Sequence, residues 1–396
     1  MNAALVLYDD ATARRFAPFS LTRPAGELRA GAALIRHRWE RIAGVAATGF
    51  VGGAHLDGFT EFDAPPLQRT EIPAGALLVN TRCAPALDAV PTGDVWRCAG
   101  RVAAVRLRSA LPFASLADGT YSLDTLAHGA DCTIDGWWMD AVWDLNRHLA
   151  PMLRADIPVL GAGAGAPPME ITVLGEHPVF VERGAYIEPY VVADTTDGPV
   201  FISAGARVGA FTRLGGPLYI GAGAIVAGGR VTACSIGDAC RVHGEVSRTI
   251  FVGHANKSHD GYVGDSVIGR WANFGAGTIT SNLKNSYGEV ALWTPDGVVG
   301  TGLTTLGSFV GDHAKLGIGT RLTTGCVVGA GANVFGASVT PKVIPPFAWG
   351  GEAPFEHWDT DKFLTVAARV MARRHATLSD PMRTLLRRAC DGRADA

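Results

Sequence analysis

One histidine, His259, is set in surroundings that suggest acid–base chemistry. It is flanked by Lys257 and Asp260, and small residues and short apolar steps surround the three polar side chains. An imidazole titrates near neutral pH, so it can accept a proton from an amine that attacks a thioester. The thioester oxygen then gains negative charge and needs an N–H donor, for which the backbone of residues 275–277 (GAG) is a candidate. A lone histidine more often has a structural role, but this context favours a functional one.

A longer pattern contains this histidine. Segments 257–265 (KSHDGYVGD) and 273–282 (NFGAGTITSN) resemble the acetyltransferase half of the bifunctional UDP-N-acetylglucosamine pyrophosphorylase/glucosamine-1-phosphate N-acetyltransferase family. The resemblance implies that His259 is the catalytic base and that acetyl-CoA is the co-substrate.

The same resemblance implies the binding residues. Those for the acceptor sugar phosphate and its amine are Lys257, Tyr262, Asn273, Asn282, Lys284, Glu245 and Arg248. Those for acetyl-CoA are Ala276, Gly277 and Lys342. A lysine of the family is Ser247 here, and a tyrosine is Leu283. These departures leave the acceptor open between an amino-sugar phosphate and a sugar nucleotide.

An apolar residue recurs at every sixth position through much of residues 198–340, usually with a glycine after it. The runs are Ile202, Val208, Leu214, Ile220 and Val226, then Ile236 and Val242, then Ile268 and Phe274, then Val310, Leu316, Leu322, Val328 and Val334. A period of six fits neither a helix nor a simple alternating strand, and it is the hexapeptide signature of a parallel β-helix. We expect glycine to allow tight corners. The phase breaks at 251–267 and 280–309, and the second break predicts a loop reaching over a neighbouring site.

This repeat resembles the left-handed parallel β-helix of acyl- and nucleotidyltransferases. In that family three coils pack as a trimer and the active sites lie between them, so the resemblance implies a homotrimer. Segments 359–376 and 379 onwards predict C-terminal helices that cap the solenoid.

The N-terminal half carries a second group of polar residues. Residues 3–7, 76–80 and 101–107 are apolar runs that predict strands of an α/β domain. Arg15, Arg23 and Arg29 precede most of these strands, and arginine forks suit phosphate oxygens. Asn80 follows a predicted strand, where the ligand site of an α/β fold lies.

Segment 15–24 (RFAPFSLTRP) resembles the opening motif of sugar-phosphate nucleotidyltransferases. The resemblance implies Mg²⁺-dependent nucleotidyl transfer, with a nucleoside triphosphate bound by Arg15, Thr22, Arg23, Arg29 and Asn80; it leaves the metal ligands unassigned. The family's glycine positions hold Asp9, Asp10, Ala11 and Ala13, and its lysine position holds Ala25. A modified loop must therefore replace the glycine-rich one.

Composition limits the class of protein. The net charge is −2 and 18% of residues are charged, which does not favour nucleic-acid binding. No apolar run reaches the roughly 18–20 residues of a membrane span, and the N-terminus lacks a secretion signal. The seven scattered cysteines form no CxxC pair, which favours reduced thiols and a cytoplasmic location.

The sequence predicts three parts and one principal function. Residues 1–160 form a variant nucleotidyltransferase-like domain, 171–345 a β-helix acyltransferase domain, and 355–396 a helical cap, with a linker at 161–168. Residues 137–150 predict an amphipathic helix. We expect acetyl transfer to an amino-sugar 1-phosphate coupled to nucleotidyl transfer, which yields UDP-N-acetylglucosamine. One alternative is a UDP- or dTDP-sugar pyrophosphorylase-like enzyme whose β-helix only trimerises or regulates, and another is a non-catalytic assembly protein.

Overall fold

The computed structural model describes residues 4–165, 169, 171–336 and 339–392. By contacts, the chain forms two compact units. The first contains the chain up to Leu145 and the segment Ser379–Gly392, and the second contains Asn146–Leu378. These two units are defined by contacts, and the three predicted domains, 1–160, 171–345 and 355–396, stay a prediction. Residues 166–168 of the predicted linker lie outside the described residues.

A mixed six-stranded sheet forms the centre of the first unit. Its order is β4 (Ala47–Val51), β1 (Leu5–Tyr8), β5 (Leu77–Asn80), β8 (Arg101–Arg106), β7 (Val95–Cys98) and β9 (Asp131–Thr133). β1 is parallel to β4 and β5, and β8 is antiparallel to β5 and β7. All residues of β1 and β5 are buried, as expected for strands covered on both faces. The strands predicted at 3–7, 76–80 and 101–107 correspond to β1, β5 and β8.

Short elements surround this sheet. Helix α1 (Ile35–Ala43) ends at Gly44, whose φ of 68° is the left-handed conformation that favours glycine. Helix α5 (Asp380–Asp391) begins after Ser379, whose side chain accepts a hydrogen bond from the Met382 N–H. The remaining elements of this unit are the pairs β2 (Arg29–Ala30) with β3 (Ala33–Leu34) and β6 (Cys83–Pro85) with β10 (Gly136–Trp138), and 3₁₀ helices at Ala13–Arg15, Ala25–Glu27, Ala54–Leu56, Phe113–Leu116 and Leu123–Leu126.

The helix predicted over residues 137–150 is wrong in its first half. Residues Gly136–Trp138 form β10, which pairs antiparallel with β6. Adjacent tryptophans suit a strand, because successive side chains then point to opposite faces. Helix α2 (Asp144–Arg147) and helix α3 (Leu149–Gly161) follow.

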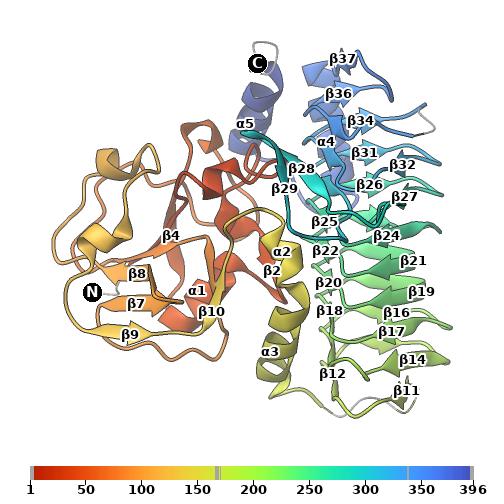
Figure 1. Ribbon diagram of the computed structural model, residues 1–396, viewed down its shortest axis with the longest axis horizontal. Coiled ribbons are helices and arrows are strands. Elements are labelled where there is room, and N and C mark those ends of the chain that lie inside the picture. Colours follow the sequence, from red (N-terminus) through yellow and green to blue (C-terminus); the bar gives the residue numbers. More distant parts are fainter. Residues whose placement is uncertain (1–3, 166–168, 170, 337–338, 393–396) are drawn as a thin grey trace. The chain divides into compact units, whose positions relative to one another are not determined.

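The second unit is a parallel β-helix whose strands stack on three faces, as Figure 1 shows. Face A contains β12 (Val179–Val181), β15 (Val200–Ile202), β18 (Leu218–Ile220), β20 (Ser235–Ile236), β22 (Ile250–Phe251), β25 (Val267–Ile268), β30 (Phe309–Val310), β33 (Val327–Val328) and β35 (Val343–Ile344). Face B contains β13 (Tyr186–Ile187), β16 (Arg207–Val208), the first parts of β19 (Ile225–Thr232) and β21 (Arg241–Ser247), then β23 (Asn256–Lys257), β26 (Asn273–Phe274), β31 (Lys315–Leu316), β34 (Asn333–Val334) and β36 (Ala348–Trp349), with β37 (Glu356–His357) antiparallel at its end. Face C contains β11 (Ile171–Leu174), β14 (Val191–Asp194), β17 (Arg213–Gly215), the second parts of β19 and β21, and β24 (Tyr262–Gly264), and it is continued by β27 (Ile279–Thr280) and β32 (Arg321–Leu322).

The predicted hexapeptide ladder is the interior of this β-helix. Every apolar residue of the predicted runs is at most 2% exposed and belongs to one continuous core. The predicted fold class, an α/β domain followed by a hexapeptide-repeat β-helix and C-terminal helices, is therefore confirmed.

The glycine that follows the apolar residue is required for a reason other than a tight corner. A Cβ on Gly269 would lie 2.7 Å from the Asp312 nitrogen, and one on Gly329 would lie 2.1 Å from the Pro346 nitrogen. Neither glycine has a positive φ, whereas Gly277, in the corner itself, has a φ of 70°. Glycine after the apolar step thus lets successive coils approach closely, and a different glycine turns the corner.

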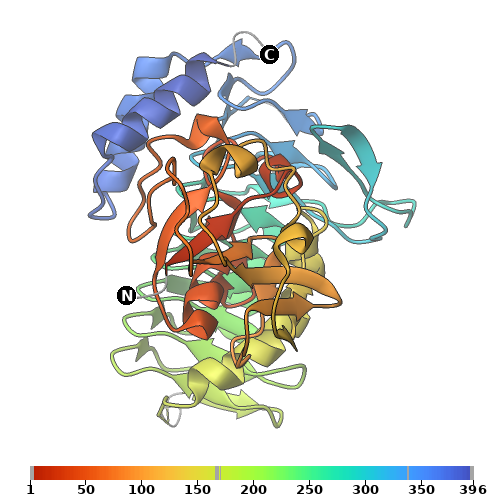
Figure 2. The ribbon, with the colours of Figure 1, turned by 90° about the vertical axis from the view of Figure 1, so that its left-hand side faces the viewer.

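The two predicted interruptions have different outcomes. Between 251 and 267 the prediction is wrong, because β22, β23, β24 and β25 continue the coil. Between 280 and 309 the chain leaves the coil and forms the hairpin β28 (Ala291–Thr294) and β29 (Gly297–Gly300), which projects from the side of the β-helix in Figure 2.

Two helices accompany the β-helix within the second unit. Helix α3 contacts β15 and β18 (Figure 1), and helix α4 (Thr360–Ala372) buries Phe363, Leu364, Ala367 and Met371. In the part of the chain that the structure describes, no helix has the length and apolar character needed to cross a membrane.

Candidate active sites

His259 lies exposed at the corner between face B and face C, between β23 and β24. The next coil stacks directly on this corner, because the Gly277 N–H donates to the Asp260 carbonyl at 3.1 Å. Since Asn256 pairs with Asn273, the same register places Ala276 opposite His259. The structure therefore brings the predicted base beside the predicted backbone donor.

The backbone N–H of Ala276 differs from those at comparable corners. The N–H groups of Ala204, Ala210 and Ala222 donate to carboxylates of neighbouring coils, at 2.7, 2.9 and 3.2 Å. Within the described residues, the Ala276 N–H has no such acceptor, and the position in register on the following coil holds the apolar Ile318. Ala276 itself is exposed, so this donor is open to a ligand.

Lys257 lies inside the β-helix. It pairs with Val242 in the ladder and is only 2% exposed. Its ammonium donates to the carbonyls of His243 and His259, at 2.8 and 2.5 Å. Burial lowers the pKa of this amine to about 8. The lysine thus holds the backbone of the histidine corner from within rather than facing outward.

A cavity of about 370 Å³ opens beside face C of the β-helix. It is lined by the predicted residues Glu245, Arg248 and Tyr262. Stacking aligns two of them, because Arg230, Glu245 and Tyr262 occupy one register on three successive coils. The Tyr262 hydroxyl lies 3.0 Å from the Ser247 hydroxyl, and burial raises the pKa of the phenol.

Sequence reasoning missed two cations of this cavity, Arg154 and Arg230. With Arg248 they place three guanidinium groups around one cavity, an arrangement suited to phosphate oxygens. The six-residue period does not predict the register of Arg230 with Glu245, because a bulge between Val226 and Gly229 shifts it. Arg154 comes from helix α3, outside the repeat.

Asp265 connects two other predicted residues. Its carboxylate accepts hydrogen bonds from the Arg248 guanidinium and from the Asn282 amide, the latter at 2.5 Å. Asn282 and Arg248 are therefore held together from different coils.

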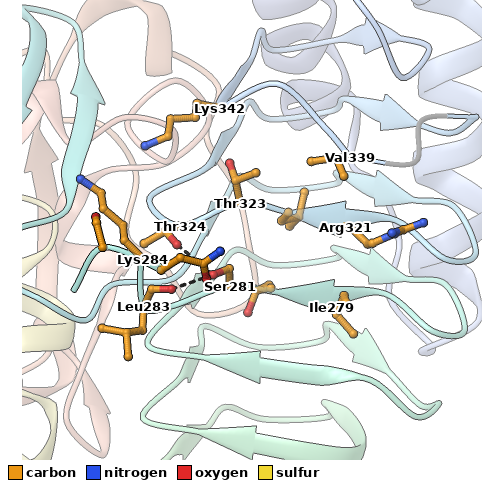
Figure 3. A pocket seen from close by; sticks show the side chains of 13 residues that line it. Ile279, Ser281, Leu283, Lys284, Arg321, Thr323, Thr324, Val339 and Lys342 are labelled. Carbon is orange, nitrogen blue, oxygen red and sulfur yellow. Dashed lines mark hydrogen bonds between the residues drawn. The ribbon is translucent and has the colours of Figure 1, made fainter. Parts of the chain in front are cut away.

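The cavity in Figure 3 brings together Lys284 and Lys342, which extend from one side of it, while Arg321 lies on the opposite side. Its volume is about 650 Å³, and residues 279–286 and 321–324 form much of its lining. The Lys284 ammonium donates to the Glu289 carbonyl, and the Ser281 hydroxyl lies 2.9 Å from that of Thr324. Two ammonium groups at one side of an apolar cavity suit a ligand with phosphates and a long organic chain.

Asn273 lies apart from Tyr262 within one chain. Because Phe274 and Val263 point into the core, Asn273 and Tyr262 point outward from face B and face C respectively. The Asn273 side-chain oxygen accepts a hydrogen bond from the Asn256 amide at 2.9 Å.

In the N-terminal unit, a cavity of about 380 Å³ lies at the carboxyl ends of β1 and β5, where α/β folds bind ligands. Asn80 lines it and donates to Asp10 at 2.9 Å. Arg82 pairs with Asp10 at 2.8 Å, and both Arg82 and Arg101 lie over the ring of Trp138. The sequence analysis missed Asp10, Arg82 and Trp138 as lining residues.

The other predicted nucleotide-binding residues lie elsewhere. Thr22, Arg23 and Arg29 are at most 3% exposed. Arg23 pairs with Glu61 at 2.9 Å, and Arg29 donates to the Ala32 carbonyl at 2.6 Å. Arg15 is exposed at the end of a 3₁₀ helix. None of the four lines the cavity that contains Asn80.

The side chains around this cavity do not fit Mg²⁺ as they lie. Arg82 binds both Asp10 and Asp140, and Arg101 binds Asp140 as well. A cation would have to displace these guanidinium groups from the carboxylates it needs. The described residues contain no cluster of three or more His, Cys, Asp or Glu side chains suited to a metal.

Comparisons with known proteins agree with this architecture. Residues 5–164 match the family described as sugar nucleotidyl transferase. A bifunctional sugar-1-phosphate nucleotidylyltransferase/acetyltransferase of Sulfurisphaera tokodaii is 34% identical over 98 residues, which are 25% of this chain and 24% of that protein. The bifunctional protein GlmU of a Jannaschia species is 33% identical over 198 residues, 48% of this chain and 38% of that protein.

A solved hexapeptide transferase family protein from Anaplasma phagocytophilum is 14% identical, with a TM-score of 0.23, and the match covers 57% of this chain and 95% of that one. The chain spans only about a quarter to two fifths of the two curated relatives.

In this chain, a segment that matches the sugar nucleotidyl transferase family is joined to a parallel β-helix of hexapeptide repeats. Over parts of its length, the chain is similar to a bifunctional sugar-1-phosphate nucleotidylyltransferase/acetyltransferase and to the bifunctional protein GlmU.

Proposed function

We propose that the β-helix transfers an acetyl group from acetyl-CoA to the amine of an amino-sugar 1-phosphate. The observation that carries this proposal is the open Ala276 N–H in register with the exposed His259. A base and an oxyanion donor on adjacent coils are the two groups that acyl transfer to an amine requires.

The reaction needs three contributions from the chain. His259 accepts a proton as the amine attacks the thioester carbon. The Ala276 N–H donates to the thioester oxygen while that oxygen carries negative charge. Collapse of this intermediate releases the CoA thiolate and leaves the amide. Lys257 positions the histidine by fixing its carbonyl.

The two cavities of the β-helix divide the substrates between them. Three guanidinium groups line the face C cavity, so we assign it to the acceptor phosphate, with Tyr262 and Glu245 at the sugar. Lys284 and Lys342 border the larger cavity, which we assign to acetyl-CoA. The sequence implied that Lys284 binds the acceptor, and we now assign it to acetyl-CoA instead.

We also propose that the active enzyme is a homotrimer, and the exposed corner at His259 supports this proposal. His259 lines neither cavity, and Asn273 faces away from Tyr262 in the same chain. A neighbouring coil packed against this corner would supply a second wall and a second set of contacts, as the family resemblance implies.

We assign nucleotidyl transfer onto a sugar 1-phosphate to the N-terminal unit, so that the two halves together yield UDP-N-acetylglucosamine. The family match over residues 5–164 and the cavity at Asn80, Arg82 and Trp138 support this assignment. The aromatic ring suits a base or a sugar, and the arginines suit its phosphates.

The acetyltransferase is tested by His259→Ala. We expect acetyl transfer from acetyl-CoA to glucosamine 1-phosphate to fall by at least about 100-fold, with an unchanged oligomeric state. Transfer at the natural rate would contradict the role of His259 and favour a β-helix that only assembles subunits.

The N-terminal assignment has a separate test. Arg82→Gln should abolish pyrophosphate release from UTP and a sugar 1-phosphate, because the cavity loses a guanidinium assigned to the substrate phosphates. Arg106→Gln is the matched control, since Arg106 donates to the Gly75 carbonyl outside the cavity. Equal activity in both variants would contradict the assignment.

A further inference from the structure

We propose that the cavity between face B of the β-helix and helix α4 binds a small anion carrying a phosphoryl group. The cavity measures about 300 Å³ and shares no lining residue with the two cavities assigned above. It is thus a third cavity in the second unit, and Asn273 is the one of its lining residues that the family resemblance implies for the acceptor.

Four cationic side chains line this cavity, and no acidic residue does. Arg241 and Lys315 come from face B, while Arg373 and Arg374 follow directly after helix α4. Within the described residues, none of the three arginines forms an ion pair. Positive charges that lie close together without a neighbouring carboxylate favour the binding of a negatively charged ligand.

Arg374 shows that this charge is uncompensated. Its buried Nε atom has no hydrogen-bond partner. Burial lowers the pKa of this guanidinium, and the charge of Arg241 lowers it further. A buried donor without an acceptor is unfavourable, and a bound anion would supply the acceptor that the Arg374 Nε–H lacks.

Two further donors complete the cavity. The Lys315 amine donates to the Trp271 carbonyl at 2.5 Å, which fixes it at the cavity wall, and burial lowers its pKa to about 7. The Asn273 oxygen accepts from Asn256, and within the described residues the Asn273 amide has no acceptor of its own. A ligand there meets guanidinium, ammonium and amide donors together.

The shape and the donors favour a phosphoryl group. Guanidinium forks match pairs of phosphate oxygens. With a volume of about 300 Å³, the cavity has room for more than a single small ion. Free pyrophosphate and the phosphate of a sugar ester share this chemistry, and the experiment separates them.

Amide hydrogen exchange of the full chain tests the proposal, with inorganic phosphate, pyrophosphate and a hexose 1-phosphate added in separate arms. We expect slower exchange in residues 366–374, because the ligand ties the end of helix α4 to face B. Protection by phosphate or pyrophosphate identifies a free inorganic ligand, and protection by the ester alone identifies a phosphate ester. Unchanged exchange in all three arms would overturn the proposal.

Variants locate the site. Arg374→Gln and the exposed Arg373→Gln should each weaken binding by about ten-fold, as loss of one charge-assisted hydrogen bond predicts. Arg369→Gln is the matched control. It also removes one positive charge near the end of helix α4, but Arg369 lines the adjacent cavity and not this one. Equal weakening in all three variants, or undiminished protection in Arg374→Gln, would overturn the assignment to this cavity.

Discussion

Asp265 holds Arg248 by two parallel hydrogen bonds, from Nε at 2.5 Å and from Nη2 at 2.8 Å. The carboxylate side chain is 3% exposed, whereas the arginine side chain is 48% exposed. The hydrogen bond that Arg248 donates to Asp265 raises the pKa of Arg248. The buried carboxylate of Asp265 therefore anchors Arg248, whose exposed part remains available to line the acceptor cavity.

Asp265→Asn tests whether Asp265 contributes to acceptor binding by holding Arg248 in place. We expect the KM for glucosamine 1-phosphate to rise about ten-fold, with a smaller change in kcat, because the phosphate contact becomes less ordered. The free energy of unfolding should fall by about 1–3 kcal/mol, since Arg248 and Asn282 lose a charged acceptor. Steady-state kinetics and chemical denaturation measure the two effects.

The matched control is Asp194→Asn, which weakens an exposed pair with Arg213 on the same face. Exposed pairs contribute little to stability, so both kinetics and stability should stay close to those of the natural chain. A KM effect in the control as large as that of Asp265→Asn would argue against anchoring.

Gly264 leaves the space that Tyr262 occupies. A Cβ at Gly264 would lie 2.1 Å from the Tyr262 hydroxyl oxygen. Gly264→Ala should therefore displace the phenol from Ser247, raise the KM for the acceptor, and lower stability by about 1–3 kcal/mol through overpacking. Gly163→Ala, whose added Cβ meets nothing within 4 Å, should leave the KM unchanged. Similar kinetics in both variants would show that Tyr262 does not contact the acceptor.

The β-helix was readable from the sequence because one short rule is repeated. An inward apolar residue at every sixth position fixes the coil without long-range information, and all of the predicted positions lie in the core. The error at 251–267 has two causes. The inward pairs Val246 and Phe251, and Val263 and Ile268, are five positions apart instead of six. In addition, Lys257 occupies an inward position, so a charged residue interrupts the apolar pattern. A lysine is tolerated there because two backbone carbonyls accept its protons.

The N-terminal cavity was less readable, because its residues meet through pairings between distant segments. Arg23 has the chemistry of a phosphate contact, yet Glu61, far along the chain, neutralises it inside the domain. Asp10 and Arg82 come together only because β1 and β5 are neighbours in the sheet. No local sequence motif predicts the pairing of Arg23 with Glu61 or that of Asp10 with Arg82. Trp138 was misplaced for a related reason, because strand β10 was predicted as a helix.

Ala276→Pro tests the proposed oxyanion donor directly, because proline lacks the N–H. We expect kcat for acetyl transfer to fall by about 100- to 1,000-fold, the usual cost of losing one such donor. Ala276→Gly keeps the N–H and should retain most of the activity. Binding of acetyl-CoA, measured by calorimetry, shows whether the proline variant keeps the site. A proline variant that binds the cofactor and also keeps its kcat would exclude this N–H from the reaction.

Lys257 should make stability depend on pH in a defined window. Its amine has a pKa of about 8 in the folded chain, because burial disfavours its charge, against about 10.4 when unfolded. Between these values the unfolded chain holds more protons, so the free energy of unfolding rises with pH, by about 1 kcal/mol per unit at most. Lys257→Met removes this contribution. Denaturation of both proteins from pH 7 to 10.5 should show the natural chain gaining stability relative to the variant above pH 8, and a constant difference would contradict the buried, weakened amine.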